Sequence, residues 1–473
     1  MAVSEGSPPV PDALAVLAAT SYGIDLDVVV AAERFTGRPG EVLRVPVQAP
    51  PGVPARLLLV GTGGSSSPEV RRAGAALARA IRGRGTVLTS LAGGLPPSAT
   101  RALVEGLLLG GYRPPARGTK NRDDTAAARE VVLLGSVDET EVERGRSHAV
   151  ATATARDLAM TPSNVKNPRW LAELAVAEGE RAGLVVRVLT GHELVEEGFG
   201  GLVAVGGGSA VPPALVRLDY VPSDAARGRE TRPVVLVGKG ITFDTGGLSI
   251  KPRESMVPMK TDMAGAGAVL AALLACPGLG VRRPVTGLLA LAENAVGGAS
   301  YRPGDVVRHV GGRTVEVSNT DAEGRMVLAD ALAYADSALD PDVVVDLATL
   351  TGAVTLGLGR RHAALFTGDD ALAAELEAAG GEAGEAVWRL PLVEDYRSAL
   401  DSSVADLRHL ADGPVGAGAV VAALFLREFA GRRRWAHLDI AGTARADKDE
   451  YEISRGATGY GARLLLRWLE GLR

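Results

Sequence analysis

The sequence predicts an α/β protein of two domains, each a mixed sheet flanked by helices. Three observations carry this prediction. The chain has 473 residues, whereas a single hydrophobic core stops growing at about 250 to 300 residues. Apolar strand-like runs alternate with Ala-rich helical stretches along almost the whole chain. Charged clusters follow directly after two of the apolar runs, at the carboxyl ends of strands, where open α/β sheets bind their ligands.

The domain boundaries are predicted from one long break in the strand pattern. Residues 140–162 are polar and Ala-rich, with one internal glycine, until Thr161 and Pro162 interrupt them. We expect an N-terminal α/β domain at residues 1–139, a connecting helix at 140–162, and a C-terminal domain at 163–473 that carries the functional site.

In the N-terminal domain, apolar runs predict strands and amphipathic stretches predict helices. Strands are expected at Val28–Val30, Leu57–Val60, Thr86–Leu88 and Val131–Leu134, and helices at about Val70–Ile81 and Ala99–Leu108. Val60-Gly-Thr-Gly-Gly64 follows one of these strands. A glycine cluster of this kind either cradles a phosphate or makes a tight turn, and the turn is favoured because no further motif accompanies it.

The C-terminal domain has more strands, and several are continuous apolar runs. Strands are expected at Val185–Leu189, Leu215–Tyr220, Val234–Val237, Val285–Leu291, Thr314–Val317, Val343–Leu347 and Trp435–Ile440. Continuous apolar runs are typical of strands that helices cover on both faces. We therefore expect a buried, mixed sheet.

Composition excludes several classes of function. Apolar residues make up 46% of the chain and the formal charge is −5, which indicates a globular protein and disfavours nucleic-acid binding as its main activity. The N-terminus lacks the pattern of a secretory signal. No apolar run is expected to reach the ~18 residues of a membrane span; the longest candidate lies near Gly416–Leu426. The lone Cys276 suits a reducing cytoplasm and is expected to be buried and inert.

Two short stretches concentrate charge after apolar strands. One is Lys239-Gly-Ile-Thr-Phe-Asp244, with Lys251 and Asp262 behind it, and the other is Asn319-Thr-Asp-Ala-Glu-Gly-Arg325. Charged groups are not expected beside a sheet interior unless something neutralises them. The helical spacing after Arg325 predicts a helix whose backbone N–H groups would also favour an anion near its start.

Carboxylates dominate these stretches. Asp321 and Glu323 lie two positions apart, so in extended chain they point to the same side, and Asp244 and Asp262 could approach from neighbouring loops. Packed together without cations, these groups would repel one another. Oxygen-rich clusters favour Mn²⁺, Mg²⁺ or Zn²⁺, and four carboxylates could bridge two ions about 3.5 to 4 Å apart.

The histidines point away from a histidine-bound metal. They are scattered singly, without an HExxH pairing, at His148, His192, His309, His362, His409 and His437. We expect oxygen ligands to dominate any metal site.

The two lysines leave two interpretations open. Two dications would lower the pKa of Lys239 until its neutral amine could coordinate a metal, while a protonated Lys251 could polarise a substrate carbonyl. Alternatively, both lysines simply pair with nearby carboxylates.

Several motifs resemble those of the leucyl (cytosol) aminopeptidase family. The resemblance rests on Val237–Pro252, on Met259–Ala266 and on the heptapeptide Asn319–Arg325, and it continues through Thr161–Asn164, Glu293–Asn294, Tyr301–Asp305, Ala348–Gly352 and Trp435–Thr443. It covers essentially the whole chain from Thr161 onward. Before residue 140 the match is loose.

The resemblance implies a role for each motif residue. It implies two divalent ions, Mn²⁺ or Zn²⁺, that are held by Lys239, Asp244, Asp262, Asp321 and Glu323, with Asp244 and Glu323 as bridges. Lys251 would contact the scissile carbonyl and Arg325 would hold bicarbonate as general base. Residues around the substrate would be Met259, Asn319, Thr349, Leu350 and Gly352.

The activity that the resemblance implies is hydrolysis of peptides by a water that bridges the two ions, with release of the N-terminal residue. Leu-like residues are expected to be preferred. The resemblance also implies a homohexamer that acts on peptides. The lone cysteine, the short apolar runs and the acidic charge predict a cytoplasmic protein without a membrane partner and disfavour nucleic acid as a partner.

Two other functions compete with this one. A two-metal phosphoesterase would use a similar carboxylate cluster, but it would usually add histidine ligands. A DNA-binding or regulatory role of the N-terminal domain would have to overcome the acidic charge of the chain.

Overall fold

The structure is a computed structural model that describes residues 2–5, 25–46, 56–115, 126–222, 232–411, 413 and 416–472. The chain divides into two compact units. Unit 1 comprises Met1–Ala153 with Asp447–Arg455, and unit 2 comprises Thr154–Ala446 with Gly456–Arg473. The helix α5 (Glu139–Met160) covers most of the predicted connecting segment, and the division between the units falls within it. The α/β class of the prediction is confirmed.

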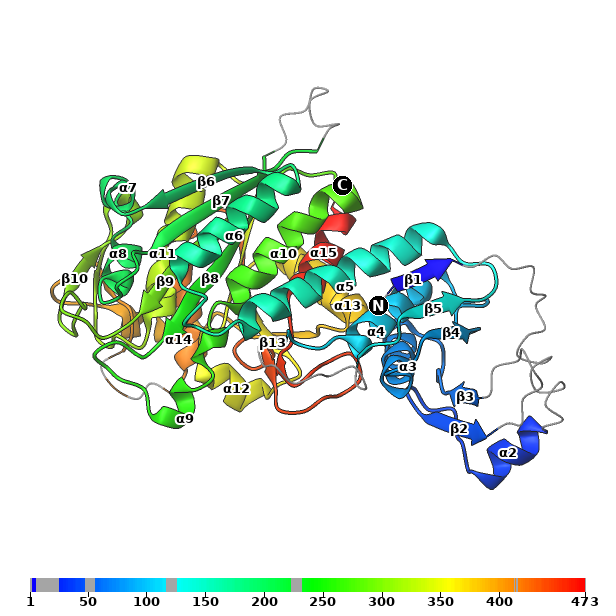
Figure 1. The fold of residues 1–473 in the computed structure, drawn as a ribbon. Helices are drawn as coiled ribbons and strands as arrows, with labels where there is room; N and C mark the ends of the chain where they lie inside the picture. The colour runs from blue at the N-terminus through cyan, green and yellow to red at the C-terminus, as the bar shows by residue number, and fades with distance from the viewer. Residues whose placement is uncertain are drawn as a thin grey trace. The chain divides into compact units, whose positions relative to one another are not determined.

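Unit 1 contains two small sheets and two well-packed helices. Its elements are β1 (Ala2–Glu5), α2 (Leu26–Ala32), β2 (Val42–Pro46), β3 (Arg56–Val60), α3 (Ser67–Ala80), β4 (Thr86–Thr89), α4 (Pro97–Gly111), β5 (Glu130–Leu133) and the first part of α5. The order β1-β5-β4 is parallel, and β2 and β3 form an antiparallel pair. The helices α3 and α4 pack on each other (Figure 1). Val70, Leu103 and Leu107 are fully buried in the core cluster of this unit.

The prediction of a strand at Val28–Val30 is wrong, because these residues lie in the helix α2. The apolar β-branched run suggested a strand, but Asp25 precedes it as N-cap. Its side chain accepts hydrogen bonds from the N–H groups of Asp27 and Val28, at 3.0 and 3.3 Å. This cap satisfies the first donors of a helix and starts it despite the low helix propensity of valine. The helices and the remaining strands predicted in unit 1 are present, with shifts of a few residues at their ends.

Unit 2 is built on an eight-stranded sheet. The sheet has the order β14-β13-β16-β12-β8-β9-β7-β6. The strands are β6 (Val185–Thr190), β7 (Ala214–Tyr220), β8 (Val234–Asp244), β9 (Val285–Asn294), β12 (Val343–Ala348), β13 (Ala363–Phe366), β14 (Val387–Arg389) and β16 (Arg434–Asp439). Pairing is parallel through β16, β12, β8 and β9 and antiparallel toward β7 and β6. The sheet is therefore mixed, as predicted, although β13 and β14 were not anticipated.

Helices cover both faces of this sheet (Figure 1). Besides the last part of α5, the helices of unit 2 are α6 (Pro168–Arg181), α7 (His192–Glu196), α8 (Gly200–Gly206), α9 (Arg253–Met256), α10 (Ala264–Leu279), α11 (Glu323–Tyr334), α12 (Gly352–Leu358), α13 (Asp370–Ala383), α14 (Gly418–Arg427) and α15 (Ala462–Gly471). Short 3-10 segments are η3 (Met259–Thr261), η4 (Val310–Gly312) and η6 (Glu394–Leu400), and a π-helical turn, η5 (Ala335–Leu339), extends α11. Small strands are β10 (Val306–Arg308), β11 (Thr314–Glu316), β15 (Leu407–Arg408), β17 (Arg445–Ala446) and β18 (Gly456–Ala457).

The alternation of side chains along β8 decides what faces the site. Gly238 lies against Ala266 of α10, while Val235 and Val237 belong to the core cluster formed with α8, α11 and α14. Because the side-chain period of a strand is two, Lys239 continues the face of Val237 toward α11. The central strand thus delivers a lysine to the start of α11.

One expectation about this region needs correction. Lys239 was expected on a loop after Val237, but β8 continues to Asp244, with an irregular register between Ile241 and Asp244. The pairing of β8 with β9, which is also long, explains the extension. Both ends of the first motif are therefore held by a buried strand, which fixes their positions more firmly than a loop would.

A second correction concerns apolar length. Arg253–Leu279 is long and apolar enough to pass as a membrane span by composition, contrary to the expectation that no stretch would be. However, 67% of this window is buried inside the structure, and its main part is α10, which packs on β8, β9 and β12. Packing against the sheet accounts for its apolar character. Cys276 is buried in the same helix, as expected.

Candidate metal centre

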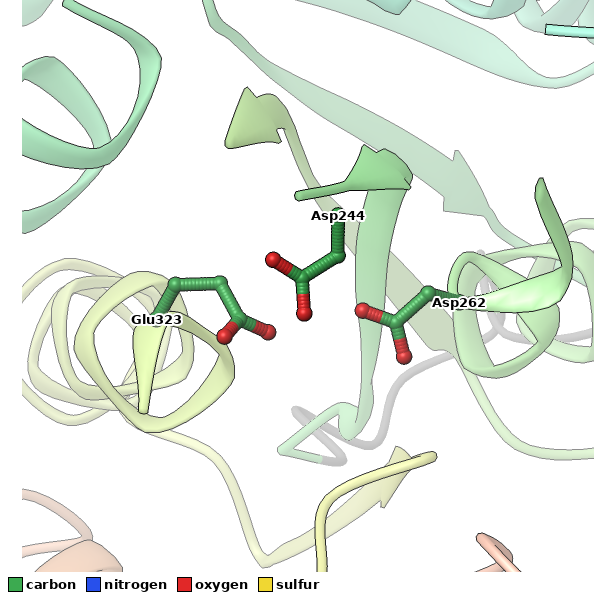
Figure 2. A group of neighbouring side chains, drawn as sticks. All are labelled: Asp244, Asp262 and Glu323. Carbon is green, nitrogen blue, oxygen red and sulfur yellow. The ribbon is translucent and has the colours of Figure 1, made fainter. Parts of the chain in front are cut away.

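Three carboxylates from separate elements meet at the carboxyl ends of the central strands. Asp244 ends β8, Asp262 follows η3, and Glu323 begins α11. Each offers one oxygen within 4.8 Å of the others, and all three residues are buried. Figure 2 shows the three side chains turned toward one another. The structure therefore brings together three of the four carboxylates that the sequence predicted as metal ligands.

Lys239 lies among these carboxylates. Its Nζ is 2.7 Å from Oε1 of Glu323 and 2.9 Å from Oδ2 of Asp262, and it donates a hydrogen bond of 2.9 Å to the carbonyl of Thr349. Burial alone would lower the pKa of Lys239, but Asp262, Glu323 and Asp244 outweigh this effect and raise it well above its ordinary value. In this structure the lysine is a cation that offsets the acidic cluster.

Asp321, the fourth predicted carboxylate ligand, joins the cluster through Lys251. The Nζ of Lys251 is 2.8 Å from Oδ2 of Asp244 and also forms an ion pair with Asp321. Asp321 lies in a turn before α11, and Glu323 begins that helix, so the expectation that the two residues lie in locally extended chain is wrong. Burial opposes the charge of Lys251, but Asp244 and Glu323 prevail and raise its pKa.

The carboxylates themselves are strained electrostatically. Burial raises the pKa of Asp262 to about 8; Glu323 and Asp244 add to the shift, and Lys239 opposes it. Burial and the charge of Glu323 also raise the pKa of Asp244. Each shift means that negative charge costs free energy at this place. A bound cation would relieve this cost.

The donor set fits a hard or borderline divalent ion. Among the described residues, Oδ2 of Asp262 and Oδ1 of Asp321 are buried and accept no hydrogen bond. Lys239 and Lys251 form ion pairs with these oxygens but do not donate hydrogen bonds to them. Oxygen atoms that are buried, negatively charged and without a hydrogen bond are what Mn²⁺, Mg²⁺ or Zn²⁺ would bind. The residues present therefore fit the metal that the sequence predicted.

Neighbouring polar groups hold the carboxylates in place. Asn294 donates from Nδ2 to Oδ1 of Asp244 at 2.8 Å and to the carbonyl of Thr320 at 3.0 Å. Thr349 donates from its hydroxyl to Oδ1 of Asp262 at 2.6 Å. The sequence analysis gave Asn294 no role, although this residue ends β9 and is the register partner of Asp244 in the parallel pair of strands. A polar residue at the end of a neighbouring parallel strand was the signal that could have identified it.

Arg325 lies two residues after Glu323 in α11 and is also buried. Its Nη1 donates a hydrogen bond of 2.6 Å to the carbonyl of His409, and its buried Nε has no hydrogen-bond partner among the described residues. Burial lowers the pKa of Arg325 to about 10, although Glu323 and Asp439 oppose the shift. The guanidinium group of Arg325 therefore has at least one N–H group that can donate to an anion.

The residues predicted around a substrate lie on two segments beside the cluster. Met259 is in η3, and its carbonyl accepts a hydrogen bond of 3.2 Å from the N–H of Asp262. Asn319 accepts a hydrogen bond of 2.8 Å at Oδ1 from the N–H of Asp321. Thr349 contacts Lys239 and Asp262 directly. Thr349 thus bonds to a carboxylate itself, whereas Met259 and Asn319 bond to the backbone N–H groups of Asp262 and Asp321.

The other two predicted residues follow Thr349 in the same loop. Leu350 is partly buried against the core, and Gly352 is exposed at the start of α12. The buried Asp439 fixes this loop, because its carboxylate accepts hydrogen bonds from the N–H groups of Leu350 and Thr351 at 3.1 and 3.0 Å. Sequence reasoning did not identify Asp439 as a support.

The chain matches two models of one protein family. Residues 153–466 match the catalytic domain of the cytosol aminopeptidase family, and residues 2–116 match its N-terminal domain. A probable cytosol aminopeptidase of Geobacter sulfurreducens is 43% identical over 446 residues, which cover 91% of this chain and 88% of that protein. One of Streptomyces coelicolor is 41% identical over 466 residues, with coverage of 92% and 88%.

A solved structure agrees with these sequence matches. The bottromycin maturation enzyme BotP in complex with Mn superposes with a TM-score of 0.86 at 40% sequence identity, covering 95% of this chain and 97% of that one. Both domain models, the relatives over most of their length and the cluster of buried carboxylates lead to one assignment. This chain belongs to the cytosol aminopeptidase family and is a metallo-aminopeptidase, a hydrolase.

Proposed function

We propose that this enzyme uses two divalent metal ions, Mn²⁺ or Zn²⁺, to release N-terminal residues from peptides, with Leu-like residues preferred. One observation carries the proposal: three buried carboxylates with oxygens within 4.8 Å of one another, two of them paired with a buried lysine. The Mn in the BotP structure supports manganese as one of the two candidate metals. The proposed ligands are Lys239, Asp244, Asp262, Asp321 and Glu323, with Asp244 and Glu323 shared by both ions.

Bound at these residues, two divalent ions supply Lewis acidity and a water of lowered pKa. Lys239 can serve as a ligand only as a neutral amine, and dications beside it favour that form. The carboxylates that now pair with Lys239 and Lys251 would exchange these partners for stronger cations. Asn294 and Thr349 keep Asp244 and Asp262 oriented during this exchange, because each donates a hydrogen bond to one carboxylate oxygen.

Lys251 is the proposed electrophile of the reaction. Its side chain is only 13% exposed, and its ammonium group pairs with Asp244 and Asp321 at the edge of the cluster. In the metal-free protein, Asp244 and Glu323 raise the pKa of Lys251 against the effect of burial, so the amine is protonated at neutral pH. A protonated amine at this edge can donate a hydrogen bond to the scissile carbonyl and stabilise the negative charge that develops on its oxygen.

Arg325 would hold a bicarbonate ion as the base that takes the proton of the attacking water. The support for this role is a buried guanidinium that, among the residues the structure describes, has no hydrogen-bond partner at Nε and no ion pair with a carboxylate. A planar anion that presents two of its oxygen atoms side by side matches the fork of guanidinium donors.

Substrate selection is assigned to the two segments beside the cluster. The loop Thr349–Gly352, which Asp439 fixes, would run along the peptide backbone, together with Asn319. Met259 would contact the side chain of the N-terminal residue. An unbranched thioether adapts to Leu- or Met-like groups, which supports the proposed preference.

The assembly and the location of the enzyme are also proposals. Family membership supports a homohexamer and the names of the relatives support a cytoplasmic location. Size-exclusion chromatography with light scattering tests the assembly. A particle of six 48.6 kDa chains is expected, and a monomer would overturn this part.

The central test is hydrolysis of leucine p-nitroanilide by metal-stripped protein before and after addition of Mn²⁺ or Zn²⁺. Activity should return with metal in the wild type and stay absent in Glu323→Ala. Glu377→Ala, which removes an exposed carboxylate on α13, is the matched control and should behave as the wild type does.

Two results would count against the proposal. Folded, metal-loaded protein that cleaves neither this compound nor a panel of peptides with free amines would remove the peptidase function, and phosphoesters would be tested next. Equal activity of Glu323→Ala and Glu377→Ala would show that the carboxylate cluster is not the metal site.

A further inference from the structure

His409 lies outside every motif that suggested the function, yet it is in contact with the most specific of them. It follows β15, which pairs in parallel with β11, the strand that leads into the heptapeptide. The residue is 0% exposed. This pairing brings a ring from a segment about ninety positions later to the turn Ser318–Asp321.

The ring of His409 bonds to the backbone at two successive residues. Nε2 lies 2.8 Å from the carbonyl oxygen of Asn319, and Nδ1 lies 3.2 Å from the amide nitrogen of Ser318. Burial, followed by the charge of Arg325, lowers the pKa of His409 to about 4, so the ring is neutral at neutral pH.

A neutral ring that satisfies both contacts has one tautomer. Nε2–H donates to Asn319, and Nδ1 accepts from the N–H of Ser318. The carbonyl of Glu316, 3.1 Å from Nδ1, accepts a hydrogen bond of 3.3 Å from the backbone N–H of His409 itself. Every described group around the ring is therefore satisfied without a second ring proton.

The backbone of His409 makes a third contact. Its carbonyl oxygen accepts the 2.6 Å hydrogen bond from Nη1 of Arg325. On the other side, Asn319, whose carbonyl the ring holds, uses its own side chain to accept a 2.8 Å hydrogen bond from the N–H of Asp321. One residue is thus connected to the turn of a proposed metal ligand and to the guanidinium proposed to hold the base.

We propose that His409 is a positioning residue of the active site, which sets the turn that carries Asp321 with its ring and directs Arg325 with its carbonyl. This inference rests on the proposed function, since it assumes that Asp321 binds metal and that Arg325 acts in the reaction. Groups that orient metal ligands typically change metal affinity or activity about 10- to 100-fold when they are removed.

A purely structural histidine would behave differently. His309 provides the comparison within the same unit: it is equally buried and its Nδ1 pairs with Oδ1 of Asp330 at 2.7 Å. Replacing His309 should lower stability without selective loss of metal binding. Replacing His409 should lower metal affinity even where the protein remains folded.

The test compares two variants of similar volume, His409→Gln and His409→Met, with His309→Gln as control. Glutamine keeps a donor that can reach the Asn319 carbonyl, whereas methionine has none. Mn²⁺ affinity by calorimetry, kcat and KM on leucine p-nitroanilide, and the thermal midpoint are measured for each protein. If His409→Met does not fold, the pair His409→Asn and His409→Leu takes its place.

We expect His409→Met to bind Mn²⁺ about 10- to 100-fold more weakly and to lose kcat more than KM, with His409→Gln recovering most of both. His309→Gln should keep wild-type Mn²⁺ affinity. Wild-type Mn²⁺ affinity and kcat in a folded His409→Met, or equal losses in the methionine and glutamine variants, would overturn the inference. A wild type that neither binds Mn²⁺ nor cleaves peptides would instead remove the proposed function.

Discussion

Gly324 and Lys239 fit against each other so closely that a Cβ atom at position 324 would lie 2.6 Å from Cε of the lysine and 2.7 Å from its Nζ. Gly324 is the second residue of α11, where glycine costs about 1 kcal/mol relative to alanine in helix propensity. The stem of Lys239 passes over this glycine to reach Glu323 and Asp262. The absence of a side chain at position 324 therefore makes room for Lys239, although it does not favour the helix.

Gly324→Ala is expected to displace Lys239 from the carboxylates. The contact involves the lysine stem beside buried elements, so the side chain cannot keep its present path. We expect kcat/KM on leucine p-nitroanilide to fall at least about 100-fold, the effect of a misplacement of about 1 Å at an active site. Steady-state kinetics with saturating Mn²⁺ measure this.

Gly267→Ala is the matched control for that variant. Gly267 also lies in a helix, α10, but a Cβ there would meet the flexible end of Met263 at 3.3 Å and be in ordinary contact with the carbonyl of Ala155 at 3.7 Å and Cβ of Leu158 at 3.9 Å. Activity should be unchanged, and the thermal midpoint should rise slightly, because alanine favours a helix by about 1 kcal/mol. Equal activity of the two alanine variants would show that Lys239 has room to move.

Lys251→Met should separate catalysis from metal binding. Methionine removes the ammonium group that pairs with Asp244 and Asp321 but keeps much of the side-chain volume. Loss of one group that stabilises an oxyanion typically lowers kcat about 100- to 1,000-fold. Mn²⁺ affinity should be retained or increased, because a competing cation is gone. Calorimetry together with kcat checks this, and a parallel loss of affinity and kcat would assign Lys251 to metal binding instead.

Much of the fold could be predicted because its signal is local. Continuous apolar runs revealed the central strands of unit 2, and Pro and Gly marked their ends. The error at Val28–Val30 came from three β-branched residues whose preference was overridden by the N-cap at Asp25. The short strands β13 and β14 lacked a pattern long enough to be recognised and owe their state to pairing with neighbours.

The site divides in the same way. Carboxylates after apolar strands were visible in the sequence, and three of them do meet. Asn294, Asp439 and His409 were given no role, because their value lies in partners that are brought near by strand pairing. No periodicity within their own segments marks such residues.

One compositional signal was available for the lysines. Only six of the 51 basic residues are lysines, at positions 120, 166, 239, 251, 260 and 448. In a chain that otherwise uses arginine, a lysine marks a place where a compact ammonium group is needed. Four of the six, Lys166, Lys239, Lys251 and Lys260, lie in or beside the segments that hold the candidate metal centre.

Because His409 is neutral in the folded protein, we expect the stability of the fold to fall in acid. Its pKa falls from the ordinary 6.5 to about 4 on folding, mainly through burial and then through Arg325, with a small contribution from His309. Between these values the unfolded chain binds a proton that the folded protein does not, so stability is lost as pH falls from 6.5 to 4. A shift of this size corresponds to about 3 kcal/mol.

Comparison of the wild type with His409→Gln isolates this effect. Thermal midpoints are measured in chelator from pH 7.5 to pH 4.5, so that the carboxylates titrate equally in both proteins. The wild type should lose stability more steeply below pH 6.5 than the glutamine variant, which has no proton to take up. Parallel curves would show that His409 is protonated in the folded protein as well.

Lys166→Met is expected to loosen the junction between α5 and the turn before Asp262. The buried Nζ of Lys166 donates to the carbonyls of Leu158 and Ala159 at 3.0 and 3.2 Å, in the last turn of α5, and also to the carbonyl of Lys260. Burial, and then the charge of Lys260, lower the pKa of Lys166 to about 7. In its protonated form the amine has one proton for each of the three carbonyls. Methionine would leave these acceptors buried without a donor, at a cost of about 1 to 3 kcal/mol. The thermal midpoint should fall accordingly.

A control variant and the addition of Mn²⁺ test whether the effect of Lys166→Met is specific to this junction. Lys448→Met removes a lysine that is exposed in unit 1 and should leave the midpoint unchanged. Mn²⁺ should restore much of the lost midpoint in Lys166→Met, because metal at Asp262 would hold the same turn from its other end and binds only the folded protein. A midpoint that drops without recovery on Mn²⁺ addition would show that Lys166 stabilises the end of α5 alone, with no link to the metal centre.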